Sequence, residues 1–116
     1  MPNRTANALA APRLLRRHAP VFAALSDETR LTLLAKLSHG VPCSISRLGD
    51  GMEISRQALT KHLRVLESAG LVRGESAGRE CLFELDAKPL EDARDYLSQV
   101  ASQWDDALAR LKNFVE

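Results

Sequence analysis

The segment that decides the fold is Ile54–Val72, with the sequence ISRQALTKHLRVLESAGLV. On a helical wheel at about 100° per residue, its apolar and polar residues fall on opposite sides. The apolar side holds Ala58, Leu59, His62, Val65, Leu66 and Ala69. The polar side holds Arg56, Gln57, Thr60, Lys61, Arg64 and Ser68. The segment therefore predicts an amphipathic helix with a basic outer face.

The ends of this helix are marked by residues that favour helix termini. Ser55 is a typical N-cap, and Gly70 is a typical residue beyond the last turn. Arginine, glutamine, threonine and lysine are the side chains that reach base edges and phosphates of DNA. An ordinary solvated helix carries similar charges, so the neighbouring elements decide between the two interpretations.

The segment before this helix predicts three further helices. The first spans residues 12–25, and Ser26-Asp27 then caps a second helix that ends near Ser38, before Gly40 and Pro42. The core face of the second helix is expected to hold Leu31, Leu34, Ala35 and Leu37.

The third of these helices is short and comes directly before the basic helix. It is capped by Ser44, buries Ile45 and Leu48, and ends at Gly49. A short helix, a tight turn and a longer helix with a basic outer face are the layout of a helix-turn-helix.

After Gly70 the hydrophobic period changes from that of a helix to that of a strand. Residues 71–76 and 80–85 predict two strands joined by a turn at 77–79, with Cys81, Phe83 and Leu85 on the buried face. A hairpin after a recognition helix is a wing. Arg79 at its tip is then placed for a phosphate or the minor groove, although a solvated turn is the plainer alternative.

The last helix is predicted to begin at Pro89 and to run for about seven turns. Its apolar residues recur every three or four positions: Leu90, Ala93, Leu97, Val100, Trp104, Leu108, Leu111 and Val115. The core of a small domain cannot cover a helix of this length, so a second copy of the chain is the expected partner, with Trp104 as the anchor. The alternative is that the helix folds back on its own domain.

Composition agrees with a single small domain. The chain has 116 residues, of which 27% are charged and 45% hydrophobic. It contains no apolar run of membrane-spanning length and no secretory segment, which predicts a cytoplasmic protein without a membrane partner. Residues 1–11 are expected to be a flexible tail, and residues 12–116 the folded domain.

The charge is divided unevenly along the chain, although the net charge is only +1. Residues 1–25 hold four arginines and no acid, whereas residues 84–116 hold eight acids against four bases. A DNA-binding surface must therefore be a local basic patch, and the acidic C-terminal segment should point away from DNA.

The sequence offers little for catalysis. Gly49-Asp50-Gly51 is not followed by the lysine of a nucleotide-binding loop, and no hydrolytic constellation is present, so no enzyme and no catalytic residue is predicted. His62 lies among apolar residues and is expected to be a partly buried structural histidine. Cys81 is expected to pack in the core, and Cys43, near a helix start, is a candidate redox sensor.

Three stretches together resemble the ArsR/SmtB family of winged helix-turn-helix repressors: FAALSDETRLTLLAKLSHG, SISRLGDGMEISRQALTKHLRVLESAGLV and GRECLFELDAKPL. The resemblance covers residues 21–116, and its most specific part is SRQALTKHLRVLESAGLV. The closing pattern Trp104, Leu108, Leu111, Phe114 is similar to a subgroup of the family that lacks metal sites. The resemblance implies a mainly helical fold, with about five helices and a two-stranded wing.

The resemblance also implies a homodimer joined by its first and last helices, and repression by occupying an operator. The expected interface residues are Val21, Phe22, Leu97, Val100, Trp104, Leu108 and Leu111. Metal-sensing members carry a pair of cysteines where this chain has Ser44 and Ser46, and the second family site needs a histidine, but none follows His62. Hydroxyls bind soft metals poorly, so no metal and no cofactor is expected.

The sequence therefore predicts a homodimeric DNA-binding repressor that recognises a palindromic operator in double-stranded DNA. The residues expected to contact DNA are Ser55, Arg56, Gln57, Thr60, Lys61, Arg64 and Arg79. Arg56 and Gln57 are the best candidates for base contacts, while Lys61 and Arg64 are expected to hold phosphates. The alternatives are a protein-interaction module built on the long last helix, and a repressor that responds to metal or redox state.

Overall fold

Five helices and a three-stranded sheet make up the part of the chain that the computed structural model describes, residues 12–115. The predicted flexible tail at residues 1–11 lies outside the described residues. In chain order the elements are α2 (Pro12–Leu25), α3 (Glu28–Leu37), β1 (Cys43–Ser44), α4 (Ile45–Leu48), α5 (Arg56–Ser68), β2 (Val72–Ala77), β3 (Glu80–Leu85) and α6 (Lys88–Val115). The predicted fold class, a mainly helical winged helix-turn-helix, is confirmed.

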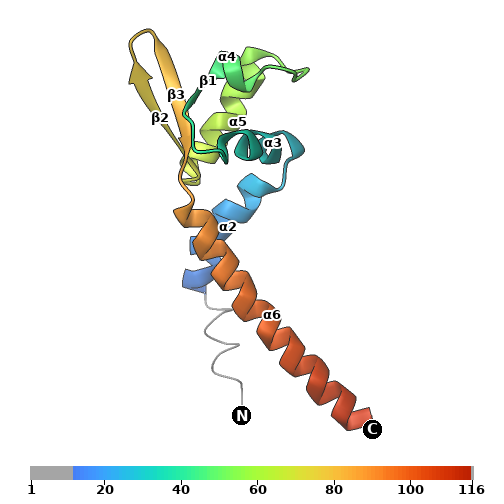
Figure 1. The fold of residues 1–116 in the computed structure, drawn as a ribbon. Coiled ribbons are helices and arrows are strands. Elements are labelled where there is room, and N and C mark those ends of the chain that lie inside the picture. Colours follow the sequence, from blue (N-terminus) through green and yellow to red (C-terminus); the bar gives the residue numbers. More distant parts are fainter. Residues whose placement is uncertain (1–11, 116) are drawn as a thin grey trace.

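The molecule is elongated because α6 leaves the body of the domain. Figure 1 shows α3, α4, α5 and the sheet gathered at one end, which we call the head, while α6 runs away from it. The extents are 64 × 26 × 22 Å, and the radius of gyration is 18.7 Å. A compact chain of this length has a radius of gyration of about 13 Å. Much of α6 therefore lies beyond the reach of the core.

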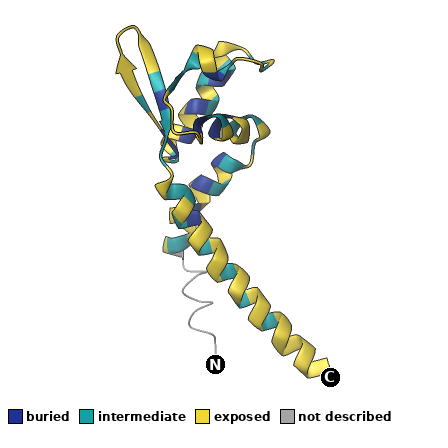
Figure 2. Cartoon of the chain, in the orientation of Figure 1, coloured by how far each residue is buried: buried dark blue, intermediate teal, exposed yellow. Residues whose placement is uncertain are grey.

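Most of the core lies in the head, where α3, α5 and the sheet meet, and α2 and the start of α6 complete it from below (Figure 2). Helix α5 contributes Leu59, Leu63 and Leu66, all at most 2% exposed. The wheel placed Val65 on the buried side, but Val65 is 41% exposed. The reason is that Val65 faces a groove between α2 and α5 that the chain leaves open, while Leu63 points into the core.

Helix α3 is rotated relative to the predicted core face. Leu33, Leu34 and Leu37 are its buried residues, whereas Leu31 and Ala35 are exposed. The expectation was right for two of its four residues, Leu34 and Leu37. The wheel for so short a helix allows a rotation of one position, and packing against α5 selects the one that buries Leu33.

The sheet has one more strand than predicted, in the order β1-β3-β2. The two-residue strand β1 pairs Cys43 with Phe83 and Ser44 with Leu82. A strand this short shows no alternation, so the sequence gives no sign of it. Cys81 is exposed instead of packing in the core, because it pairs with Ser76 towards the tip of the hairpin, which projects beyond the helices (Figure 1).

Helix α5 has well-defined ends. At its start, the Ser55 hydroxyl accepts a hydrogen bond from the Ala58 backbone N–H at 3.1 Å. At its end, Gly70 takes a positive φ of 78°, and the Leu71 N–H reaches back to the Leu66 carbonyl at 2.9 Å. Both caps agree with the prediction. The position and length of the basic helix are therefore fixed by local sequence.

Polar and aromatic contacts attach the first half of α6 to α2. The guanidinium of Arg17 lies 3.7 Å from the carboxylate of Asp92, and the buried ring of His18 stacks on Tyr96 with centroids 4.6 Å apart. A hydrogen bond of 2.7 Å from Lys88 holds the pKa of Asp92 below its ordinary value and raises the pKa of Lys88. In the second half of α6 every apolar side chain except the half-buried Ala107 is exposed.

Candidate nucleic-acid interface

The outer face of α5 is available to a ligand along its whole length. Arg56, Gln57, Lys61 and Arg64 are exposed, and the N-cap Ser55 is exposed at the end of the helix. Thr60 is half-buried, and its hydroxyl donates to the Arg56 carbonyl at 2.8 Å. The structure thus gathers the predicted residues of α5 on one face, with Thr60 set deeper than the others.

The basic residues on this face have no acidic partner among residues 12–115. Other cations of the described chain are paired: Arg73 with Glu84 at 3.0 Å and Lys88 with Asp92 at 2.7 Å. In the same region no carboxylate lies within ion-pair distance of Arg56, Lys61 or Arg64. Unpaired exposed cations on one helix face form the local basic patch that phosphates require.

The wing is joined to the end of α5. The Gly74 N–H of β2 donates to the Glu67 carboxylate of α5 at 3.2 Å. A β-carbon at Gly74 would lie 3.0 Å from the Phe83 ring, 3.2 Å from the Cys81 thiol and 3.3 Å from that carboxylate, so a larger residue would crowd this contact. Arg79 is exposed in the turn of the hairpin. Its position relative to α5 is therefore set by a direct contact between helix and wing.

Two basic residues near α4 were not singled out from the sequence. Arg47 is exposed on α4, the first helix of the helix-turn-helix, which crosses the DNA backbone in such motifs. Lys36 of α3 donates from Nζ to the carbonyls of Leu48 and Asp50, both at 2.8 Å, and so closes the end of α4. A signal for Arg47 was present, since a basic residue on that helix is favourably placed for phosphate.

Ser44, at the position of a metal-binding cysteine in metal-sensing members of the ArsR/SmtB family, and Cys43, the candidate redox sensor, both make structural hydrogen bonds. The Ser44 hydroxyl accepts from the Arg47 N–H at 3.2 Å as the N-cap of α4. Cys43 is half-buried, and its thiol donates to the Val41 carbonyl at 3.4 Å. Over residues 12–115 no group of three or more His, Cys, Asp or Glu side chains is arranged to hold a metal ion. The redox role of Cys43 stays a prediction.

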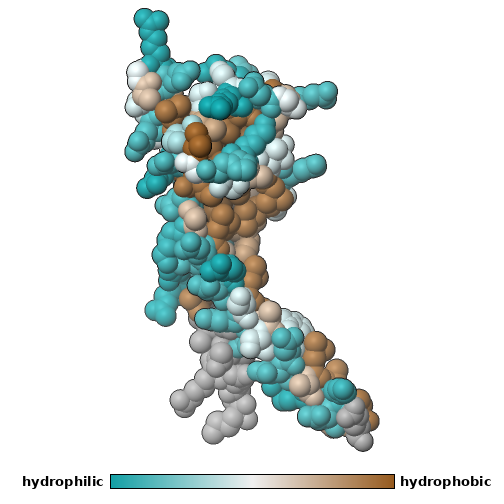
Figure 3. Space-filling model, viewed as in Figure 1, coloured by the Kyte–Doolittle hydropathy of each residue, from teal (hydrophilic) through white to brown (hydrophobic). Residues whose placement is uncertain are grey.

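A second surface, remote from the basic face, is apolar. Figure 3 shows apolar side chains at the waist below the head and again along α6. The exposed large apolar residues of α6 are Leu97 (51%), Trp104 (67%), Leu108 (57%), Leu111 (59%), Phe114 (86%) and Val115 (73%). Val100 is half-buried. The stripe predicted from the sequence is therefore largely uncovered by the chain itself.

This stripe continues into a groove of about 420 Å³ between α2 and α6, lined by Phe22, Leu25, Leu90, Ala93, Leu97 and Ala101. Phe22 is half-buried at its edge. Val21, predicted with Phe22 to meet a partner, is only 6% exposed and packs in the core of its own chain. Val21 faces the core although the next residue, Phe22, lies at the groove, so Val21 is not available to a partner.

No helix among residues 12–115 combines the length and the apolar character that crossing a membrane requires. The apolar stripe covers only one side of α6, and the other sides carry charged residues. This is the pattern of a helix that packs along one side only.

The chain is similar in sequence to known transcriptional regulators. The helix-turn-helix domain family matches residues 25–75. The HTH-type transcriptional regulator Rv2034 of Mycobacterium tuberculosis is 36% identical over 76 residues, which are 66% of this chain and 70% of that protein. The HTH-type transcriptional repressor SmtB of the same species is 32% identical over 85 residues, 73% of this chain and 61% of that protein.

The solved structures agree with the sequence relatives. The ArsR-like transcriptional regulator from Rhodococcus sp. RHA1 is 37% identical and superposes with a TM-score of 0.80, covering 87% of this chain and 92% of that one. The similarity thus extends over most of this chain and nearly all of that one. From its fold, its exposed basic helix and these relatives, the chain belongs to the ArsR/SmtB family of winged helix-turn-helix transcriptional regulators.

Proposed function

We propose that this regulator is a homodimeric repressor that binds a two-fold symmetric operator in double-stranded DNA. The observation that carries the proposal is the unpaired basic face of α5, with Arg56, Lys61 and Arg64 exposed on a helix whose opposite face is packed in the core. In a helix-turn-helix, the N-terminal end of the second helix reaches into the major groove. Arg56 and Gln57 would then contact bases, and Lys61 and Arg64 phosphates.

The wing and α4 add contacts beside the groove. Arg79 lies at the tip of the hairpin and Arg47 on α4, both exposed. In our proposal Arg79 contacts a phosphate or the minor groove, and Arg47 the backbone on the opposite side of α5. Ser55 and Thr60 complete the surface with hydroxyl groups close to the helix start.

The partner in our proposal is a second copy of the chain, joined through α6 and the adjoining part of α2. The apolar stripe of α6, in which Trp104 is 67% exposed, is larger than the apolar patches that a monomeric protein usually leaves in contact with water. At this interface Trp104 would be surrounded by Leu97, Val100, Leu108, Leu111 and Phe22. A two-fold dimer presents two copies of α5, which matches a palindromic operator.

The operator is found by capturing genomic fragments on the purified protein and sequencing them. We expect a shared inverted repeat, with half-sites about 10 base pairs apart between centres or a multiple of that spacing. Light scattering on the same sample should report a dimer. A monomer that is not retained on duplex DNA at low salt would instead favour a protein-interaction module.

The DNA-binding face is tested by Arg56→Ala and Lys61→Ala, each with Arg16→Ala as a control. Arg16 is an exposed arginine of α2, outside the proposed DNA-binding surface. Both α5 variants should weaken binding to the captured fragment, while the control should not. If both variants bind as the parent does, this face of α5 does not contact DNA.

A further inference from the structure

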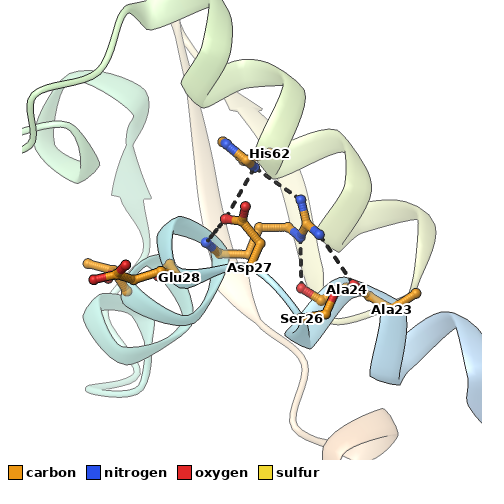
Figure 4. Close-up of polar contacts among 8 residues, drawn as sticks. Ala23, Ala24, Ser26, Asp27, Glu28 and His62 are labelled. Carbon is orange, nitrogen blue, oxygen red and sulfur yellow. Dashed lines mark hydrogen bonds and ion pairs between the residues drawn. The ribbon is translucent and has the colours of Figure 1, made fainter.

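One side chain connects the end of α2 with the recognition helix. Arg30 of α3 donates from Nε to the Ala24 carbonyl at 2.7 Å and from Nη2 to the Ala23 carbonyl at 3.2 Å. Its third nitrogen, Nη1, lies 3.2 Å from Nδ1 of His62 on α5. Figure 4 shows His62 approached from one side by the segment that carries Ala23, Ala24 and Asp27. The guanidinium thus contacts two helices at once.

The two contacts on α2 are with carbonyls of its last turn. Carbonyls at the end of a helix have no intrahelical partner and carry a partial negative charge, so a cation there is stabilising. Helix α2 forms part of the surface that we propose for dimerisation, and α5 is the helix that we propose for DNA. Arg30 therefore connects the two helices that carry these surfaces.

The contact with His62 requires a particular form of the ring. Arginine has donors but no acceptor, so Nδ1 of His62 must accept and carries no proton. The ring is then neutral, with its proton on Nε2. A second proton on Nδ1 would turn the acceptor into a donor that faces another cation, and the hydrogen bond would be lost.

A carboxylate beside the ring provides a second partner. Oδ1 of Asp27 lies 3.8 Å from Nδ1 of His62 and accepts the Arg30 backbone N–H at 3.0 Å. That backbone hydrogen bond is the main reason why the pKa of Asp27 is lowered, and the Arg30 guanidinium adds to it. Asp27 is therefore ionised at neutral pH, and a protonated ring would move towards it and away from Arg30.

We propose that Arg30 and His62 are positioning residues that fix the angle between α2 and α5, and that protonation of His62 releases this contact and weakens operator binding. The inference rests on the proposed function, because it assumes that α5 contacts DNA and α2 the partner copy. Neither residue lies on the exposed basic face. Their effect on DNA is transmitted through the orientation of α5.

The charged groups that face this contact come from both sides. Arg30 and Asp27 approach from the start of α3, and Arg64 of α5 lines the same groove as Arg30 between α2 and α5. The chain has two other histidines. His18 stacks on Tyr96 of α6, and His39 is exposed beyond the end of α3. His39→Gln is therefore a matched control for the loss of one histidine.

The first experiment reads the ring itself, without DNA, by NMR of the full chain carrying ¹⁵N-labelled histidine. At pH 8 we expect the His62 signals of a ring with Nδ1 unprotonated and Nε2 protonated. In Arg30→Met the same ring should become a mixture of the two neutral forms. A proton on Nδ1 of His62 in the parent, or an unchanged ring in Arg30→Met, would overturn the proposal.

The second experiment measures affinity for a duplex carrying the captured operator, at constant ionic strength, from pH 8 to pH 6. Glutamine has an amide oxygen that accepts from Arg30 but does not titrate, so His62→Gln should retain most of the affinity at pH 8. Over this range the parent and His39→Gln should lose severalfold more affinity than His62→Gln, because both retain the His62 ring whose Nδ1 can take up a proton. Equal pH profiles for the parent and His62→Gln would contradict the proposal.

Arg30→Lys separates charge from geometry, since an ammonium cannot reproduce the fork that holds two carbonyls and a ring. We expect affinity at pH 8 to fall severalfold while thermal unfolding shows a folded protein and light scattering the same mass as the parent. If the parent binds no duplex at any pH, the proposed function fails, and the NMR spectra still decide the Arg30–His62 contact separately.

Discussion

Helices α5 and α6 are both amphipathic, but α5 buries most of its apolar side within its own chain, whereas α6 leaves most of its apolar side exposed. Three leucines of the 13-residue α5 are buried, and its free face is polar. Only Ala93 is buried in the 28 residues of α6, and its free face is an apolar stripe. Most of the apolar side of α5 is covered by its own chain, and its polar side is free for the DNA contact that we propose. The apolar side of α6 is largely uncovered, and we propose that a second copy of the chain covers it.

The largest effect should come from the covered side of α5. Leu66→Ala should lower the free energy of unfolding by about 2–5 kcal/mol, because it removes a fully buried side chain and leaves a cavity. Val65→Ala, on the exposed edge of the same helix, is the control and should change it by about 0.5 kcal/mol or less. Urea unfolding measures both. Equal losses would mean that the two sides of α5 do not differ as described.

The next effect concerns the uncovered side of α6. Trp104→Ala should weaken dimerisation by about 2 kcal/mol or more, which is about 30-fold in the dissociation constant, as for an aromatic anchor at an interface. Ser102→Ala, on the opposite face of α6, should leave the dissociation constant near that of the parent. Sedimentation equilibrium distinguishes them, and a Trp104→Ala variant that dimerises normally would remove α6 from the interface.

On the polar side of α5, base and phosphate contacts should separate. Gln57→Ala should cost about 1–3 kcal/mol on the operator and relax specificity at one base pair. Lys61→Ala should weaken all sequences alike and reduce the slope of log affinity against log salt by about one unit. Titrations on operator and random duplex at several salt concentrations test this. Identical behaviour of the two variants would show that the face makes only one kind of contact.

A smaller effect is expected where α5 begins. Ser55→Ala should lower the free energy of unfolding by about 1 kcal/mol, because the Ala58 N–H loses its partner. Ser55→Asn is the control, since asparagine caps as well as serine. Thermal unfolding is the measurement. An equal loss in both variants would mean that the hydroxyl does more than cap the helix.

The smallest effect should be present at neutral pH and disappear in acid. The pKa of Asp27 is lowered, chiefly by the Arg30 backbone N–H, from an ordinary value of 3.8. The stability that it adds is present above that value and is lost as the pH falls through the lowered one. The difference in unfolding free energy between the parent and Asp27→Asn should therefore become smaller at low pH. Acid unfolding curves that stay parallel for the two proteins would contradict this.

The local parts of the fold were predictable, and the long-range parts were not. Caps at Asp27, Ser44 and Ser55 and the glycine after α5 depend on neighbours in the chain, and they were read correctly. The hairpin was placed within one residue of its observed strands, Val72–Ala77 and Glu80–Leu85. Helix rotation depends on distant packing, which is why Leu33 and Leu63 were missed as core residues.

The contact between Arg30 and His62 joins positions 32 residues apart, and no periodicity reveals such a pair. The wheel placed His62 among apolar residues and so indicated a structural role, but it did not identify the Arg30 guanidinium as its partner. Of the proposed DNA surface, the residues on α5 follow from one helical period. Arg47 depends on how α4 packs, which the sequence does not specify.

The two-residue strand β1 decides where this chain tolerates a change of length. Ser44 pairs with Leu82 in the sheet and also caps α4, so the third strand and the helix-turn-helix share one residue. One added residue between Cys43 and Ile45 would shift the pairing and turn side chains to the wrong face. Insertions should instead be accepted in the open turn at Gly78, where an added β-carbon meets nothing within 4 Å.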